Sequence, residues 1–174
     1  MFKFMHVMGC RLFTESQVDS FLINLWCFIN IRLISFVGVK IVKTDDTGAI
    51  VRLKVNRRTK NHLNSMYMGS QVIGAEIGPI FYAIKYCELN DLKINSEYCS
   101  VAAEFYKKTR SKYVYFYFKD TKLIKEALIK ADESSERQYQ DVEVGVYDSN
   151  CFERKQLVSK FIFKATFRKR RNKK

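Results

Sequence analysis

The stretch GSQVIGAEIGPIFYAIKY, residues 69–86, decides how this chain folds. Its eighteen residues would make a helix about 27 Å long. Because the segment is apolar on nearly all sides, we expect this helix to be buried at the centre of the molecule. Pro79 cannot donate a hydrogen bond to the carbonyl of Ala75 and should bend the helix. The only carboxylate of the segment, Glu76, precedes this bend by one turn.

Segments that alternate apolar and polar side chains surround this helix and predict β-strands. In the clearest, residues 157–169, Phe161, Phe163 and Phe167 share one face while basic side chains occupy the other. Adjacent strands joined by short connections are typical of antiparallel hairpins, and the apolar helix would cover one face of their sheet. The sequence therefore predicts an α+β fold with a mostly antiparallel sheet, built from strands at 36–43, 49–57, 98–107, 112–120, 141–148 and 157–169.

Two further helices are expected at the flanks of this pattern. Thr14 and Gln17 have the spacing of a capping box, and apolar residues then recur at helical intervals, so a lead-in helix is predicted over about 14–34. Residues 121–137 form an amphipathic pattern that ends in a polar linker. We expect one domain over 1–168, large enough to bury about two thirds of its unfolded surface, and a basic tail over 169–174.

The composition is that of a globular protein with a strong positive charge. The 174 residues carry a net charge of +13, and the last seven residues contribute six positive charges. The five cysteines are widely spaced and form no CxxC pair, which argues against a zinc site or a disulfide framework and fits a reducing compartment. No uncharged apolar run is long enough to span a bilayer, and no signal-peptide pattern is present. We expect a cytoplasmic protein with no transmembrane segment and no bound metal.

A spaced motif begins at Asn61, just before the central helix. Thioesterases of the phenylacetyl-CoA type carry an asparagine, a glycine three residues later, two adjacent glycines, and a carboxylate seven residues after the second of that pair. This chain is similar, since Asn61, Gly69 and Glu76 occupy the first position, the last glycine position and the carboxylate position without a gap. Two positions depart from the motif: Asn64 replaces the first glycine, and Met68 replaces the first glycine of the pair.

The order of elements also resembles the hotdog fold of this acyl-CoA thioesterase superfamily, in which a curved, mostly antiparallel sheet wraps a long central helix. The N-terminal stretch from residue 21 is similar to a hotdog branch known as a domain of unknown function. The resemblance implies a fold of this kind for residues from about 20 to 168.

The resemblance further implies a site that hydrolyses thioesters. Backbone N–H groups of Met68 and Gly69 would polarise the thioester carbonyl, because the first N–H groups of a helix have no intrahelical partner. Glu76 would serve as general base or nucleophile. Asn61 would orient the water or the carboxylate.

The expected partners follow from the same resemblance. The substrate would be a thioester of coenzyme A or of an acyl carrier, held across the interface of a homodimer or a dimer of dimers. Asn64 and Ser65 would contact the substrate. Coenzyme A would enter only as part of the substrate, and no other cofactor is expected.

Other interpretations stay open on the sequence alone. Glu76 could be a structural residue paired with a lysine or arginine, since an unpaired buried carboxylate is costly. Asn64 and Met68 also suit a non-catalytic protein that binds an acyl thioester or a lipid. The basic tail would suit a nucleic-acid-binding protein, which ranks last because no RNA-binding motif is present. His62 most simply belongs to a loop.

Overall fold

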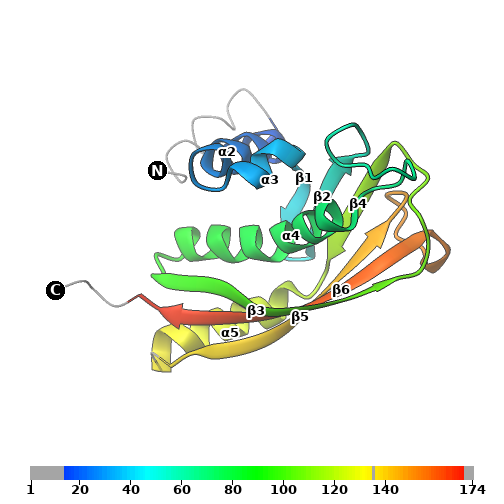
Figure 1. Ribbon diagram of the computed structural model, residues 1–174. Coiled ribbons are helices and arrows are strands. Elements are labelled where there is room, and N and C mark those ends of the chain that lie inside the picture. Colours follow the sequence, from blue (N-terminus) through cyan, green and yellow to red (C-terminus); the bar gives the residue numbers. More distant parts are fainter. Residues whose placement is uncertain (1–13, 135, 171–174) are drawn as a thin grey trace.

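The computed structural model of the protein describes residues 14–134 and 136–170. In these ranges a curved six-stranded antiparallel sheet wraps a long central helix, α4 (Figure 1). The predicted α+β architecture is confirmed. The elements are α2 (Glu15–Asn30), α3 (Arg32–Val37), β1 (Lys40–Asp45), β2 (Gly48–Lys54), α4 (Met68–Leu89), β3 (Ile94–Phe105), β4 (Tyr113–Phe118), α5 (Thr121–Ser134), β5 (Gln138–Tyr147), the 3₁₀ turn η1 (Arg154–Gln156) and β6 (Leu157–Lys169).

The strands follow the order β1-β2-β4-β5-β6-β3 across the sheet. Two pairs that are adjacent in the chain, β1 with β2 and β5 with β6, form hairpins as expected. β3 and β4, which the sequence placed on either side of a short connection, do not pair. β4 already has β2 and β5 as neighbours, so β3 lies at the far edge, and of the strands in the described ranges it pairs only with β6.

Helix α4 lies across the sheet and supplies much of the core. It begins one residue earlier and ends three residues later than predicted, and it continues through Pro79. Close approach to the sheet depends on Gly74, where a Cβ atom would lie 2.4 Å from the ring of Phe116 on β4. α5 packs beside α4 and against β5 and β6, which completes the covered face.

The N-terminal part of the chain differs from the prediction in one place. Gln17 completes the expected capping box, with its Oε1 accepting a hydrogen bond from the N–H of Thr14 at 3.0 Å. The predicted lead-in helix is two helices, however, and the first two residues of the predicted strand 36–43 belong to α3. Gly38, at φ 75°, ends α3 in the left-handed conformation, and the strand begins only at Lys40.

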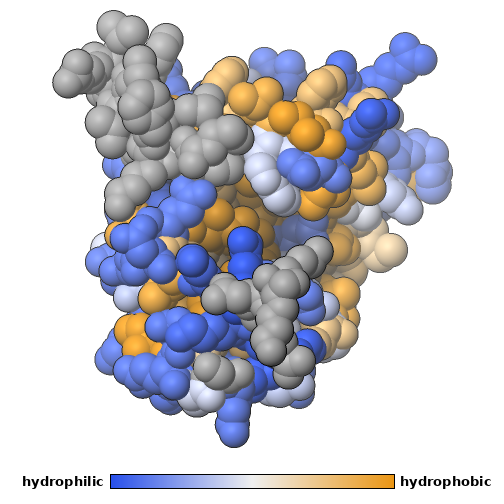
Figure 2. Space-filling view, turned by 90° about the vertical axis from the view of Figure 1, so that its left-hand side faces the viewer, coloured by the Kyte–Doolittle hydropathy of each residue, from blue (hydrophilic) through white to orange (hydrophobic). Residues whose placement is uncertain are grey.

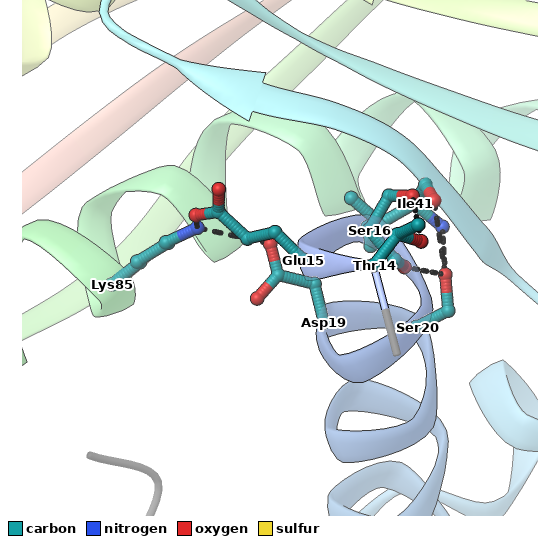
Figure 3. A network of polar contacts seen from close by, with 7 residues as sticks. All are labelled: Thr14, Glu15, Ser16, Asp19, Ser20, Ile41 and Lys85. Carbon is teal, nitrogen blue, oxygen red and sulfur yellow. Dashed lines mark hydrogen bonds and ion pairs between the residues drawn. The ribbon is translucent and has the colours of Figure 1, made fainter. Parts of the chain in front are cut away.

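Helix α2 closes one edge of the sheet. Ser20 Oγ accepts a hydrogen bond from the N–H of Ile41 at 2.9 Å and donates one to the carbonyl of Ile41 at 3.0 Å (Figure 3). Asn24 Nδ2 donates to the carbonyl of Val39 at 2.6 Å. These side chains form hydrogen bonds with main-chain N–H and carbonyl groups at and just before β1, on the side away from β2. Another strand would otherwise pair with these groups. The opposite edge, β3, pairs on one side only among the described residues.

Ion pairs hold α2 onto α4. Lys85 Nζ lies 2.6 Å from a carboxylate oxygen of Glu15 and 3.0 Å from one of Asp19, and Asp19 is buried (Figure 3). Charged groups that are buried require such pairing. α2 is therefore fixed at both the edge of the sheet and the central helix.

The domain extends further toward the C-terminus than predicted. Lys169, which the sequence assigned to the tail, is the last residue of β6 and lies 2.9 Å from Asp132 on α5. The N–H of Arg170 donates to the carbonyl of Lys93. Residues 171–174 lie outside the described ranges. Within those ranges no helix combines the length and the apolar character that crossing a bilayer needs.

Candidate active site

A cavity of about 610 Å³ separates the N-terminal helices from α4 and the start of β3. Its wall is mostly aliphatic and aromatic, and polar side chains lie at its rim. Figure 2 shows this end of the molecule, where apolar surface lies at the bottom of a hollow bordered by hydrophilic residues. The apolar wall consists of Ile23, Trp26, Ile31, Ile34, Ile77, Ile80, Ile84, Leu92 and Ile94.

Glu76 of α4 lines this cavity among apolar side chains, and Glu88, near the end of the same helix, lines it as well. No cation lies within ion-pairing distance of the Glu76 carboxylate among the described residues. Burial raises its pKa from 4.5 to about 7, because an apolar surrounding disfavours the charged form. Among the described residues, Glu76 therefore has no partner with which it could form a structural ion pair.

The negative charge of Glu76 affects the pKa values of two neighbouring residues. Burial, together with the negative charge of Glu76, raises the pKa of the Cys27 thiol to about 11. The same two causes hold the pKa of Tyr98 well above its ordinary value. The hydroxyl of Tyr98 donates to the main-chain carbonyl of Glu76 at 2.9 Å, which ties β3 to α4 at this position. Glu76 therefore lies in a poorly solvated site between three elements.

The first turn of α4 presents main-chain donors that have no acceptor. The N–H groups of Met68, Gly69 and Ser70 make no hydrogen bond within the described ranges, and the N-cap residue, Tyr67, provides no side-chain cap. The Met68 side chain is about half exposed. The helix dipole adds partial positive charge at this end, so these groups suit an oxygen that becomes negatively charged.

The loop before α4 is held by its own side chains. Asn61 Oδ1 accepts hydrogen bonds from the N–H groups of Leu63 at 3.0 Å and Ser65 at 3.2 Å. Ser65 is buried, and its hydroxyl is within 3.0 Å of the Thr109 hydroxyl. Both predicted side chains thus shape the loop from which the helix starts.

Asn64 occupies the position where the thioesterase motif has glycine, and its conformation explains why this exchange is tolerated. Its φ of 56° lies in the left-handed region. Asparagine enters this region more readily than other residues with a side chain. The Asn64 side chain accepts a hydrogen bond from Lys60 Nζ at 3.0 Å.

The predicted residues form two groups within one chain. Asn61, Asn64, Ser65, Met68 and Gly69 lie together at the start of α4. Glu76 lies eight residues beyond Met68, which corresponds to about 12 Å along the helix axis. A single thioester carbonyl cannot contact both groups of one protomer.

Sequence reasoning missed the residues that complete the cavity. Tyr98 was predicted only as the first residue of the strand 98–107. Trp26 and Cys27 were predicted only as residues within the lead-in helix. Their contribution depends on α2 and β3 meeting over Glu76, and no local pattern encodes that meeting.

Solved structures of other proteins share the fold of this chain. A protein of unknown function from Chlorobaculum tepidum superposes with a TM-score of 0.73 at 12% identity, over 89% of this chain and 97% of the other. A Pseudomonas aeruginosa protein named a probable thioesterase gives 0.69 at 14% identity, over 87% and 96% of the two chains. A thioesterase from Haemophilus influenzae gives 0.60 at 15% identity, over 83% and 87%.

The chain has the hotdog fold. The resemblance seen in the sequence is confirmed at the level of the fold by these thioesterase structures. No protein-family model and no curated protein matches the sequence. The comparisons establish the arrangement of the sheet and the central helix. The candidate chemistry is argued from the residues of this chain described above.

Proposed function

We propose that this hotdog protein hydrolyses an acyl thioester, with Glu76 as general base. The observation that carries the proposal is a carboxylate without a cation partner, in an apolar cavity, with a pKa near neutrality. A general base works best when its pKa lies near the working pH. Burial of this kind is typical of functional sites, because stability alone gives no reason to keep the group.

The active unit we propose is a homodimer, because one chain keeps Glu76 and the helix start apart. Two copies related by a two-fold axis can join their β3 edges, since β3 is the strand edge that α2 does not close. The two α4 helices then run in opposite directions. Glu76 of one protomer would face Met68 and Gly69 of its partner across a shared thioester.

The proposed reaction is direct attack by water. The Glu76 carboxylate takes a proton from water while the water oxygen bonds to the thioester carbonyl carbon. The carbonyl oxygen becomes negatively charged and is stabilised by the N–H groups of Met68 and Gly69. Collapse of this intermediate breaks the carbon–sulfur bond, and the thiolate takes the proton that Glu76 holds. The products are a carboxylic acid and a free thiol.

The cavity supports an aliphatic acyl group as the part of the substrate that is buried. Its wall follows α4 from Glu76 to Glu88, about 18 Å along the helix. Each buried CH₂ contributes about 0.8 kcal/mol. Among butyryl, octanoyl and dodecanoyl thioesters of coenzyme A, the longer chains should therefore bind more tightly.

The test is free-thiol release by the Glu76→Gln variant. Glutamine keeps the size of the side chain but cannot accept the proton, so turnover should fall by about a hundredfold or more. Glu126→Gln, on the exposed side of α5, is the matched control and should keep full turnover. Unchanged hydrolysis by a folded Glu76→Gln protein removes the proposed role.

A second candidate function, binding without turnover, is favoured by one observation. The side chains of Asn61 and Ser65 are engaged within their own loop. Saturable binding of acyl-CoA with no thiol release, by calorimetry and a thiol assay on one preparation, would select this function.

A further inference from the structure

Three loops at one end of the sheet carry a concentration of positive charge. These loops follow β2, β3 and β5 and lie together at the right-hand end of Figure 1. They hold nine lysine and arginine residues and two carboxylates. Such an excess attracts polyanions from solution. The basic residues are Arg57, Arg58, Lys60, Lys107, Lys108, Arg110, Lys112, Arg154 and Lys155.

A pocket of about 620 Å³ lies within this cluster, and we call it the loop pocket. It is lined by Leu63, Ser65, Lys107, Lys108, Thr109, Arg110, Ser111, Asp148 and Gln156. It lies at the opposite end of α4 from the cavity of Glu76, with which it shares no lining residue.

The cations of the loop pocket lack anionic partners. The side chains of Lys108 and Arg110 make no ion pair within the described ranges, and Lys107 Nζ donates only to the main-chain carbonyl of Lys155. The single lining carboxylate, Asp148, accepts hydrogen bonds from the main-chain N–H of Arg110 at 3.2 and 3.3 Å. Asp148 fixes the loop and leaves the guanidinium of Arg110 available to a ligand.

The loop pocket is preformed. The N–H of Thr109 donates to Ser65 Oγ at 3.0 Å, and the N–H of Met66 donates to Thr109 Oγ1 at 2.8 Å. Both hydroxyl residues are buried, so these bonds are protected from water. The cations therefore project from a fixed base, which lowers the entropy lost when a ligand binds.

The position of the pocket connects it to the proposed chemistry. Ser65 belongs to its lining and stands four residues before Gly69, at most about 14 Å away along the chain. A thioester whose carbonyl meets the N–H groups of Gly69 can extend its thiol portion toward this pocket. Its acyl portion would enter the cavity beside Glu76 of the other protomer.

We propose that the loop pocket binds the phosphate groups of coenzyme A, so that the thiol carrier is a nucleotide and not an acidic carrier protein. The inference rests on the proposed thioester hydrolysis. Guanidinium and ammonium groups are the usual partners of phosphate, and arginine can bind it with two parallel hydrogen bonds. A small hollow with hydroxyl donors and the half-exposed Leu63 suits a compact ligand with an apolar base better than a flat protein surface or a long RNA.

The test measures binding without catalysis. Adenosine 3′,5′-bisphosphate, which carries phosphates of coenzyme A but no thiol, should bind to the wild-type protein in calorimetry. The double variant Lys108→Ala with Arg110→Ala should weaken this binding at least about tenfold, because two charged hydrogen-bonding groups are lost. Lys130→Ala, an exposed cation on α5, is the matched control and should bind as the wild type does. Pantetheine, which lacks phosphate, should bind to the wild-type protein and to the double variant with the same affinity.

Kinetics give a second measurement. The double variant should raise KM for an acyl-CoA about tenfold with kcat unchanged, and should leave hydrolysis of the matching pantetheine thioester unaffected. Equal bisphosphate binding by wild-type and double-variant proteins overturns the inference. So does tighter binding of an acyl carrier protein, or of an RNA oligonucleotide, than of the bisphosphate at the same salt concentration.

The outcome is separable from that of the proposed function. Glu76→Gln should bind the bisphosphate normally whether or not the wild-type protein turns over a thioester. Loss of turnover with intact bisphosphate binding therefore concerns the chemistry alone. Absence of bisphosphate binding in a protein that hydrolyses thioesters concerns the loop pocket alone.

Discussion

At the scale of single residues, Glu76 shows what a sequence motif can and cannot predict. The spacing from Asn61 selected Glu76 as a candidate, and burial within an apolar segment followed from the composition around it. Whether a lysine or arginine neutralised it depended on residues from α2 and β3, which are distant in the chain. The structure resolves this point: no lysine or arginine of the described residues lies within ion-pairing distance of the Glu76 carboxylate.

The elevated pKa of Glu76 predicts two opposite effects of pH. The folded protein binds a proton at Glu76 up to about pH 7, whereas the unfolded chain releases it near 4.5. The free energy of unfolding should therefore fall as pH rises between these values, by at most about 3 kcal/mol. The proposed hydrolysis needs the carboxylate form of Glu76, so its rate should rise over the upper part of the same interval.

The Glu76→Gln variant, which cannot titrate at this position, tests the predicted pH dependence of stability. Thermal melts of this variant should lose the pH-dependent decline and show a higher Tm than the wild type above pH 7. An identical pH dependence in the two proteins would show that Glu76 does not titrate in this range.

Met68 offers a way to remove one main-chain donor without disturbing the helix. It is the first residue of α4, a position that favours proline, and Tyr67 before it has φ −64° and ψ 142°, which a following proline accepts. Met68→Pro should keep the fold and lower kcat by about a hundredfold to a thousandfold. Met68→Ala, which retains the N–H, should stay close to wild type. Equal rates for both variants would exclude the N–H of Met68 as an oxyanion donor.

At the scale of elements, the sequence predicted most helices and strands but not all their boundaries. Strong patterns, such as that of residues 157–169, were placed correctly. Residues 36 and 37 were predicted to begin a strand but end α3, because a short apolar run suits a buried strand or a short helix equally. Only the left-handed Gly38 and the packing of α3 onto α4 decide between them.

The packing of α4 on the sheet depends on one glycine in particular. A Cβ atom at Gly74 would overlap the ring of Phe116, whereas at Gly78 its nearest neighbours would lie 3.6 to 3.7 Å away. Gly74→Ala should destabilise the protein by about 1–3 kcal/mol. Gly78→Ala, the same change one turn later, should be neutral or stabilising by up to about 1 kcal/mol through helix propensity. Urea denaturation of both variants checks the difference, and equal midpoints would contradict it.

At the scale of the whole molecule, the sequence predicted the fold class but not the order of strands. Hairpins are local and can be recognised from short connections. The placement of β3 beside β6 is a long-range pairing. Among the described residues it leaves β3 as an open edge, while α2 covers β1. Open edges of this kind invite pairing with another chain.

Cys99 allows the proposed dimer to be tested directly. It is exposed at the middle of β3, beside the irregularity between Tyr98 and Ser100. If two β3 strands pair symmetrically along their length, the two Cys99 residues lie near the two-fold axis. Mild oxidation should then produce a covalent dimer of the 20.5 kDa chain. Cys99→Ser should abolish this product, while Cys151→Ser, at another exposed cysteine, should not. A protein that sediments as a monomer would rule out the two-chain site.

In the proposed dimer, the separation of Glu76 from the start of its own helix would give each polypeptide one half of two reaction centres. A homodimer of a variant that lacks Glu76, or of a variant that lacks the main-chain donors, would contain no complete reaction centre and would be inactive. Paired with each other, the two variants would rebuild one working centre from the two undamaged halves. Random exchange of such copies would restore about a quarter of normal turnover, so two silent alleles of this gene could compensate for one another in the same cell.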